Sequence, residues 1–349
     1  RLVGSEMCIR DRGMVGPSAE LPATLGISTP SSNNSDLRTK GWEVSIGWKD
    51  RLKNGLGYGI NLSLSDQITM IDSYPDNKTL SIDSYLPGYK DGLIWGYETI
   101  GIAKSDEEMQ AHLASLPKGG QDAVGSQWAA GDIMYKDLNG DGKISEGART
   151  LGDHGDLKIL GDTYSHYFFG IDLNADWKGF DFRAFFQGVL KHDYWGSGNF
   201  TGMLFGVRGG YSRWHTRGFK QHEDYFRAEP AGLEGHELPA NLDSYYPRPI
   251  FSDSSDGTSF GAKNQKVQSR YVQDASYIRL KNLQFGYTLP AKFTNKFGIN
   301  RLRIFVSGEN VWTGTGLTKL FDPETISGGN GGNAYPLSRT WSFGLSLTL

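Results

Sequence analysis

The chain has 349 residues and a formal net charge of −3, with one cysteine, 47 glycines and an aromatic content of 13%. The charge lacks the basic excess of a nucleic-acid-binding protein, a single cysteine excludes a disulfide framework, and no apolar run approaches the ~18 residues of a membrane-spanning helix. Abundant glycine and aromatic residues with short apolar runs favour an all-β chain and leave a membrane barrel open.

The first twelve residues, RLVGSEMCIRDR, differ in character from the rest of the chain. They start without Met, contain the only cysteine, Cys8, and resemble translated sequencing-adapter sequence. We therefore leave residues 1–12 out of the fold prediction, as for any sequence scar. Residues 13–38 form a poorly determined lead-in, and the patterned part of the chain spans residues 39–349.

Strict alternation of apolar and polar residues predicts strands with two different faces. Residues 41–50 place Trp42 and Trp48 at the two ends of one apolar face and put Glu, Ser and Gly on the other. A Lys178-Gly179 turn separates two further strands. The remaining alternating segments are residues 56–67, 169–177, 180–186, 276–289, 301–312 and 341–349.

One short helix is predicted inside a long loop. Ser105 followed by Glu108 has the spacing of a capping box, and Pro117 ends the apolar stripe that follows. Residues 66–166 and 192–265 are rich in Gly, Asp, Ser and Tyr, and loops of this length are usually functional or disordered. We expect the helix to be a loop element.

An acidic loop, DLNGDGKISEGA at residues 137–148, resembles the start of a calcium-binding loop. Oxygen ligands at positions 1, 3 and 5, a backbone carbonyl at position 7 and a glycine at position 6 can wrap one Ca²⁺. Position 12 is Ala148 in place of an acid, so Glu146, Asp153 or Asp156 would have to substitute; alternatively, Asn-Gly and Asp-Gly simply form turns. The candidate ligands are Asp137, Asn139, Asp141 and Lys143, and calcium is the only cofactor that the sequence suggests.

Four aromatic residues stand in glycine-rich loops. Flat aromatic faces can stack on sugar rings, as on other apolar ligand surfaces. The alternative is that these residues belong to a membrane-interface belt or to a lid contact. The candidates are Tyr194, Trp195, Tyr211 and Trp214.

The strands are long for a soluble protein. They exceed the usual ~5–6 residues and match the ~9–11 residues of a tilted membrane strand. Trp42 and Trp48 bracket an apolar stripe of ~20 Å at ~3.4 Å per residue, close to the ~25 Å lipid band flanked by aromatic girdles. A soluble β-sandwich remains the alternative, although its outer faces would carry more Lys and Glu.

Seven separate motifs follow one another along the chain: GDIMYKDLNGDGKIS, LKILGDTYSHYFFGIDLNADWKGFDFRAFFQGV, YPRPIF, QDASYIRLKNLQFGYTLP, LRIFVSGENVWT, FDPE and YPLSRTWSFGLSLTL. Together, and in this order, they resemble the SusC/RagA family of TonB-linked outer-membrane transporters. The resemblance covers residues 39–349 and implies the C-terminal part of a large plugged barrel. This chain would supply about eight to ten of its roughly 22 antiparallel strands, with long extracellular loops.

The resemblance also implies a function. Such proteins import oligosaccharides or peptides across the outer membrane of Bacteroidetes-type bacteria, with a SusD-like lipoprotein as lid and the TonB complex as energy source. The plug and the TonB-contacting segment have no match here, so TonB would act through an N-terminal part outside this chain. Outer-membrane lipid would be the remaining partner, and no nucleic acid is expected.

Two rival functions were weighed against the transporter. One is a soluble, calcium-dependent, carbohydrate-binding β-sandwich. The other is a glycan hydrolase, but the acids are scattered and no spacing marks a catalytic pair. Without a cysteine beyond residue 12, a thiol nucleophile is not expected either. The sequence therefore predicts a protein that is not an enzyme.

Overall fold

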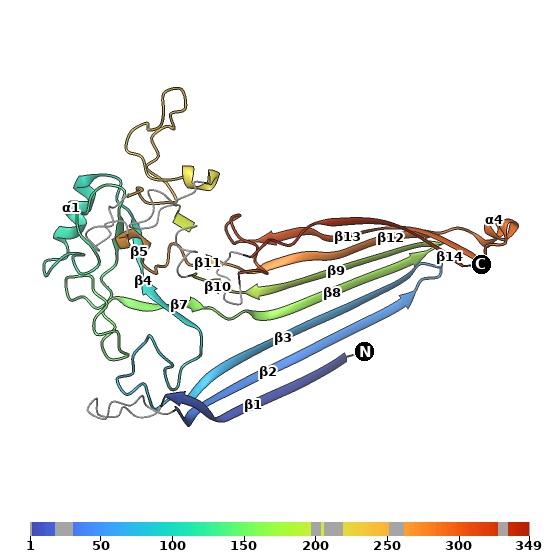
Figure 1. Cartoon of the computed structure of the whole chain (residues 1–349), viewed down its shortest axis with the longest axis horizontal. Helices are drawn as coiled ribbons and strands as arrows, with labels where there is room; N and C mark the ends of the chain where they lie inside the picture. Colours follow the sequence, from blue (N-terminus) through green and yellow to red (C-terminus); the bar gives the residue numbers. More distant parts are fainter. Residues whose placement is uncertain are drawn as a thin grey trace.

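The computed structural model describes residues 2–17, 31–196, 204–205, 219–250, 262–326 and 334–348. Within these residues, one antiparallel sheet of eight strands dominates, in the order β1-β2-β3-β8-β9-β12-β13-β14 (Figure 1). The predicted all-β fold is confirmed. The wall strands are β1 (Leu2–Pro17), β2 (Ser31–Arg51), β3 (Gly57–Ser73), β8 (His166–Trp177), β9 (Phe180–Lys191), β12 (Tyr277–Thr288), β13 (Arg301–Thr315) and β14 (Thr340–Thr348).

The edge strand β1 includes residues 2–12, which belong to the segment left out of the fold prediction. It pairs with β2 from Leu2 opposite Ile46 to Pro17 opposite Ser31. The structure thus places this segment in the sheet, while its derivation from adapter sequence stays a prediction. β2 also begins earlier than its alternation indicates, because its first ten residues extend past the apolar band and carry mostly polar side chains.

The apolar side chains of the wall strands line up on one face of the sheet. The register places Ile46 opposite Leu62, and Leu62 opposite Ile171. At the other edge, Ile304 stands opposite both Tyr287 and Leu345. Many side chains of this face are exposed, including Trp48 at 61% and Phe343 at 86%. We call it the apolar face; the opposite face carries Ser, Gly, Asn and Asp.

The two ends of the sheet differ in their connections. At one end, β8 and β9 are joined by Lys178-Gly179, whose φ values of 48° and 91° suit the two-residue turn that matches strand twist. At the same end, α4 (Ala291–Thr294) and the 3-10 helix η5 (Asn295–Phe297) join β12 to β13. The long connections, within residues 74–165, 192–276 and 316–339, all lie at the other end (Figure 1).

These long connections pack into a single body, which we call the loop assembly. It comprises the described residues of segments 74–165, 192–276 and 316–326. Three two-stranded sheets pair β4 with β7, β5 with β6 and β10 with β11. Its elements are β4 (Leu93–Tyr97), β5 (Thr99–Ile102), α1 (Asp106–Ala114), β6 (Ile133–Tyr135), β7 (Leu157–Asp162), β10 (Asp193–Tyr194), η2 (Lys220–Glu223), η4 (Ala262–Gln265) and β11 (Gln273–Asp274).

Helix α1 is capped as its sequence predicts, with one difference. The Ser105 hydroxyl accepts a hydrogen bond from the Glu108 amide, at 3.2 Å. The Glu108 carboxylate accepts from the Lys104 amide at 2.6 Å, one residue before the position expected in a capping box. The helix ends before Pro117, and Met109 is buried beneath it.

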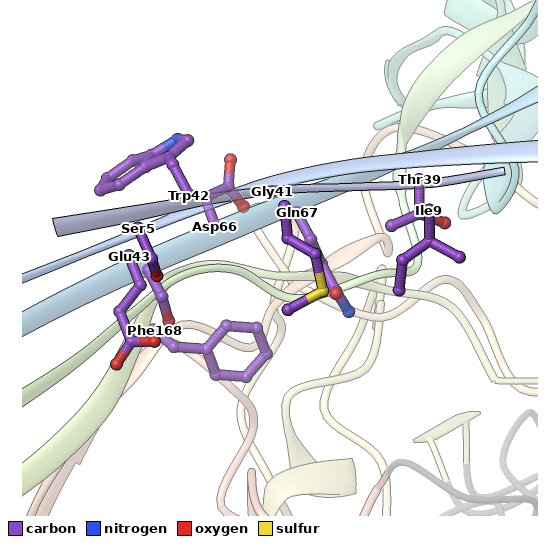
Figure 2. Close-up of a pocket in the computed structure, with 11 residues that line it drawn as sticks. Ser5, Ile9, Thr39, Gly41, Trp42, Glu43, Asp66, Gln67 and Phe168 are labelled. Carbon is purple, nitrogen blue, oxygen red and sulfur yellow. The ribbon is translucent and has the colours of Figure 1, made fainter.

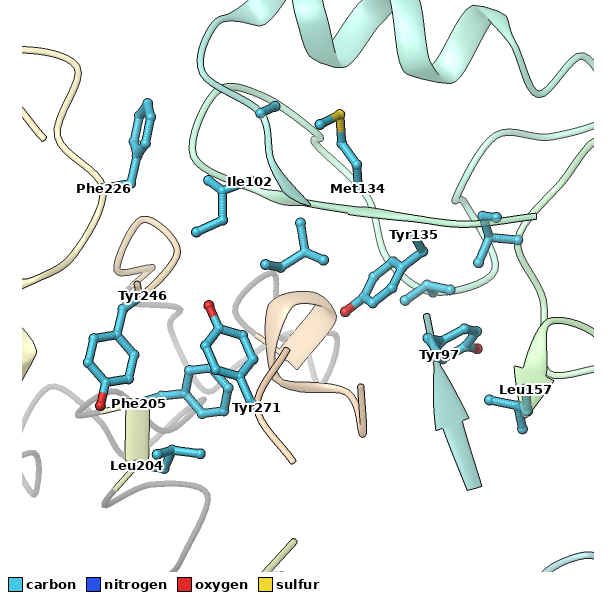
Figure 3. Packing of buried hydrophobic residues seen from close by; sticks show 14 of the residues in the cluster. Tyr97, Ile102, Met134, Tyr135, Leu157, Leu204, Phe205, Phe226, Tyr246 and Tyr271 are labelled. Carbon is cyan, nitrogen blue, oxygen red and sulfur yellow. The ribbon is translucent and has the colours of Figure 1, made fainter. Parts of the chain in front are cut away.

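The main hydrophobic core of the described residues lies in the loop assembly and includes no residue of the eight wall strands. Tyr97, Tyr135 and Tyr271 are among its largest fully buried side chains (Figure 3). The last long connection contributes Leu317 and Phe321. The loop assembly therefore has the core of a globular domain, whereas the wall sheet presents its apolar side chains outward.

Candidate functional site

The calcium-like loop follows β6 and folds back on its own backbone. The Asp137 carboxylate accepts hydrogen bonds from two glycine amides, at 2.6 and 2.9 Å. Asn139 accepts from the Asp141 amide at 2.9 Å, and Asp141 accepts from the Lys143 amide at 3.1 Å. The four predicted residues thus lie on one tight loop, and these bonds are those of turns stabilised by Asn and Asp side chains.

Each acid that could replace Ala148 has other partners. The buried Asp156 carboxylate accepts from three backbone amides, and burial raises its pKa. Glu146 pairs with Arg149 at 2.6 Å, and Asp153 accepts from the Ala148 amide at 3.1 Å. Among the described residues, no group of three or more His, Cys, Asp or Glu side chains is arranged to hold a metal ion. Calcium binding stays a prediction.

Two of the four aromatic candidates fall within the described residues. Tyr194 lies in β10 and is only 9% exposed, and burial raises the pKa of its hydroxyl. Trp195 packs against the core, with its ring centroid 6.5 Å from that of Phe205. Tyr211 and Trp214 lie outside the described residues. A stacking role for these aromatics therefore stays a prediction.

Tyr194 and Trp195 line a cavity of about 820 Å³ where the loop assembly meets the wall sheet. The wall side is formed by β2, β3 and β8, and includes the polar side chains Thr39, Gln67 and Thr69. The cavity is large enough for a small ligand, since ligand pockets span ~300–1,000 Å³. From the loop assembly come Tyr85, Lys90, Asp91, Asp162, Thr163, Tyr164, His192 and Ile326.

A buried histidine joins the wall sheet to the loop assembly beside this cavity. His166, the first residue of β8, lies 2.8 Å through Nδ1 from Asp66 Oδ1 in β3. Its Nε2 lies 3.0 Å from Asp162 Oδ2 at the end of β7. All three side chains are 10% exposed or less. The sequence marks Asp66 as unusual, because a carboxylate there follows Leu62 and Leu64 at a position where the strand pattern expects an apolar residue.

Two other titratable groups of the cavity have opposite environments. Burial lowers the pKa of His192, which favours the neutral imidazole. The Tyr164 hydroxyl donates to Asp91 at 2.7 Å, and this bond raises the tyrosine pKa to about 12. The cavity therefore has one histidine held between two carboxylates, one histidine whose pKa burial lowers and a tyrosine that donates to a carboxylate.

A smaller cavity of about 300 Å³ lies farther along the sheet (Figure 2). It is lined by β1, β2, β3 and Phe168 of β8, with Glu43 and Gln67 among its polar groups. Asp66 also borders it. The side chains that face this cavity come mainly from the polar face of the sheet.

Two motifs that the sequence brought out separately meet in a buried charge cluster. Arg279, from the YIRLKNL run, donates to Asp322 of FDPE at 2.7 Å, and its Nη1 lies 3.3 Å from Glu324. Lys281 donates to the same glutamate at 2.7 Å. Arg279 is only 3% exposed, and its Nε donates to Thr313 at 2.8 Å. This cluster attaches the last long connection to β12 and β13.

A second buried charge network lies wholly inside the loop assembly. Asp132 and Lys263 form an ion pair at 2.7 Å in which both side chains are fully buried. Arg248 and Asn264 also donate to Asp132, at 2.8 and 2.9 Å. The network joins segments that lie more than 100 residues apart in the chain, and no local sequence pattern marks its members.

Comparison with curated proteins identifies relatives over nearly the whole chain. TonB-dependent receptor P3 of Formosa agariphila is 27% identical over 94% of the chain, and TonB-dependent receptor P26 of the same organism is 25% identical over 94%. Over 94% of its length the chain is therefore similar to TonB-dependent receptors. It spans 30% and 31% of the lengths of these two relatives. No protein-family model matches the chain.

Comparison with solved structures supports the fold of this chain. The RagAB peptide transporter matches 99% of the chain with a TM-score of 0.62 at 17% identity. The RagAB peptide importer in an open-open state matches 100% with a TM-score of 0.59 at 18% identity. In both cases the chain covers 33% of the solved chain. In the described residues, no helix is long and apolar enough to cross a membrane.

Proposed function

We propose that this chain forms part of the wall and the extracellular loops of an outer-membrane importer for oligosaccharides or peptides in a Gram-negative bacterium. One observation carries the proposal: the eight-stranded sheet exposes an apolar face, and its long connections gather at one end. Outer-membrane barrels combine a lipid-facing apolar band, short periplasmic turns and long extracellular loops in this way. The relatives named above are receptors, which agrees with a protein that is not an enzyme.

The apolar face argues against the soluble sandwich. A sandwich would cover this face with a second sheet. In the part of the chain that the structure describes, the other sheets have two strands each and lie in the loop assembly. Exposed apolar patches of this extent are rare on soluble monomers and mark contact with another apolar phase. Membrane lipid is the partner that fits an apolar face bordered by Trp42 and Trp48, and the rest of the barrel would complete the wall.

The proposed partners follow from the relatives and the neighbours in structure. TonB dependence is part of the relatives' names, so energy from TonB, acting through a part of the protein outside this chain, is proposed here as well. The RagAB neighbours are named as peptide importers, which supports a peptide as cargo beside an oligosaccharide. A SusD-like surface lipoprotein is proposed as the lid over the loop assembly.

Gene deletion in the source bacterium tests the proposal. The deletion strain should lose uptake of either a fluorescent oligosaccharide or a fluorescent peptide, and the complete gene should restore it. A tonB deletion should abolish the same uptake, and affinity purification of the tagged protein from outer membranes should recover a lipoprotein. Unchanged uptake of every oligosaccharide and peptide tested, or recovery of the protein in the soluble fraction, would contradict the proposal.

A further inference from the structure

The clamp around His166 is one of several polar links between the wall sheet and the loop assembly; the others include the Arg279–Asp322 pair and the backbone hydrogen bonds that join β3 to residues 88–91. Asp66 belongs to β3 of the wall sheet, and Asp162 ends β7 of the loop assembly. The imidazole lies between their carboxylates, at 2.8 and 3.0 Å. We propose that His166 is a pH-dependent latch that holds the loop assembly against the wall when the imidazole is protonated.

Hydrogen-bond chemistry supports the charged state of the closed latch. An ionised carboxylate only accepts hydrogen bonds, and a neutral imidazole has a hydrogen on one nitrogen only. Two carboxylates facing both nitrogens therefore require hydrogens on both, which is the imidazolium ion. A neutral ring would place a lone pair against one carboxylate in a site where His166 is only 6% exposed. Loss of the proton thus breaks one of the two bonds and leaves a buried acceptor unpaired.

The surrounding charges leave the two carboxylates as the main partners of the ring. Lys191, opposite His166 on β9, lies 4.0 Å from Asp193. Asp193 in turn accepts from the Asp162 amide at 3.1 Å. On β2, Trp42 stands opposite Asp66, and Lys40 on the next position of that face is exposed. Burial lowers the pKa of His192, and the charged side chains Lys90 and Asp91 line the same cavity as His166.

The direction of the pH response follows from the same contacts. The latch lies just past the end of the pairing between β3 and β8, whose last pair is Ser65 with Phe168. Burial by itself lowers the pKa of His166, but the hydrogen bonds to Asp162 and Asp66 outweigh burial and raise that pKa above its ordinary value. A raised pKa means that the latch stabilises the structure fully below the ordinary pKa of ~6.5 and weakens as the pH rises through the folded value.

Two backbone amides report directly on the latch. The Tyr167 amide donates to Asp66 at 3.3 Å, and the Tyr164 amide donates to Asp162 at 2.9 Å. In the complete gene product in detergent micelles, we expect hydrogen–deuterium exchange protection of residues 162–167 to fall at least tenfold between pH 6 and pH 9. This fall is measured after correction for the intrinsic pH dependence of exchange.

Variants separate the latch from a general effect of pH. His166→Gln should lower protection at pH 6 and abolish its pH dependence, whereas His192→Gln, in the same cavity, should keep the wild-type profile. If His166→Gln fails to fold, ¹⁵N chemical shifts of labelled histidine decide in the wild-type protein: both His166 nitrogens should carry hydrogens at pH 6.5. A neutral His166 ring at that pH, or a pH profile that His166→Gln leaves unchanged, would overturn the latch. Neither readout uses transport, so a failure here is independent of the proposed function.

Discussion

Arg279 provides the sharpest test of how the last long connection is held. The guanidinium is 3% exposed and faces two acids of one loop, Asp322 at 9% and Glu324 at 15% exposure. The Asp322 carboxylate also accepts from the amides of Glu324 and Leu337, at 3.0 and 3.2 Å. Arg279→Gln removes the cation and leaves these buried carboxylates facing each other. Glu324 keeps its ion pair with Lys281, whereas Asp322 loses the guanidinium group that donates to it.

The size of the effect can be set from burial. Breaking a buried pair by removing one partner typically costs about 3–5 kcal/mol, because the remaining charge stays desolvated. The loop also contributes Leu317, Phe321 and Ile326 to the core, so its release would expose apolar surface. We therefore expect the free energy of local opening of residues 316–326 to fall by about 3 kcal/mol or more.

Hydrogen exchange of the complete protein in micelles measures this local opening. Arg51→Gln is the matched control, because its pair with Asp176 has a similar 2.8 Å separation but exposed side chains of 62% and 56%. An exposed pair contributes about 0–1 kcal/mol, and this one lies at the opposite end of the sheet. Adding Asp322→Asn to Arg279→Gln should cost less than the sum of the single changes. A loss below about 1 kcal/mol for Arg279→Gln, or strict additivity, would refute the reasoning.

Three further predictions concern the loop assembly. Lys263→Met should reduce the stability of the loop assembly by about 3 kcal/mol, measured by thermal unfolding, since Asp132 remains buried and loses the ammonium group paired with it; no change would contradict the network. Ser105→Ala should destabilise α1 by about 1 kcal/mol, seen as faster exchange of the Glu108 amide, while exchange of the β7 amides stays unchanged. Calcium at millimolar concentration should raise the melting temperature and Asp137→Asn should remove the rise, whereas an unchanged melting temperature in the wild type would refute the calcium prediction.

The strands of the wall could be predicted because a single physical rule governs them. One face meets an apolar phase and the other a polar one, so alternation is visible wherever a strand crosses the band. Alternation no longer marks a strand where it extends beyond the apolar phase. β2 continues from residue 41 back to Ser31, where both faces are polar and no alternation remains.

The loop assembly was predicted only in outline. The capped helix depends on residues three apart, and such local chemistry is readable in sequence. The clamp of His166 joins residues 100 positions apart, and the pair of Lys263 with Asp132 joins residues 131 apart. Such contacts follow from tertiary packing. In the sequence, the clamp is marked only by Asp66, a charged residue at an apolar position of the strand pattern.

Solvent accessibility along β2 tests most directly whether the sheet is a membrane wall. In the complete protein, with Cys8 replaced by Ser and any other native cysteine removed, single cysteines at positions 44 to 47 would carry a spin label in lipid nanodiscs. We predict that labels at Val44 and Ile46 collide mainly with oxygen, which concentrates in lipid, and labels at Ser45 and Gly47 mainly with a water-soluble nickel complex. Equal access of the nickel complex to all four positions would contradict a lipid-facing sheet.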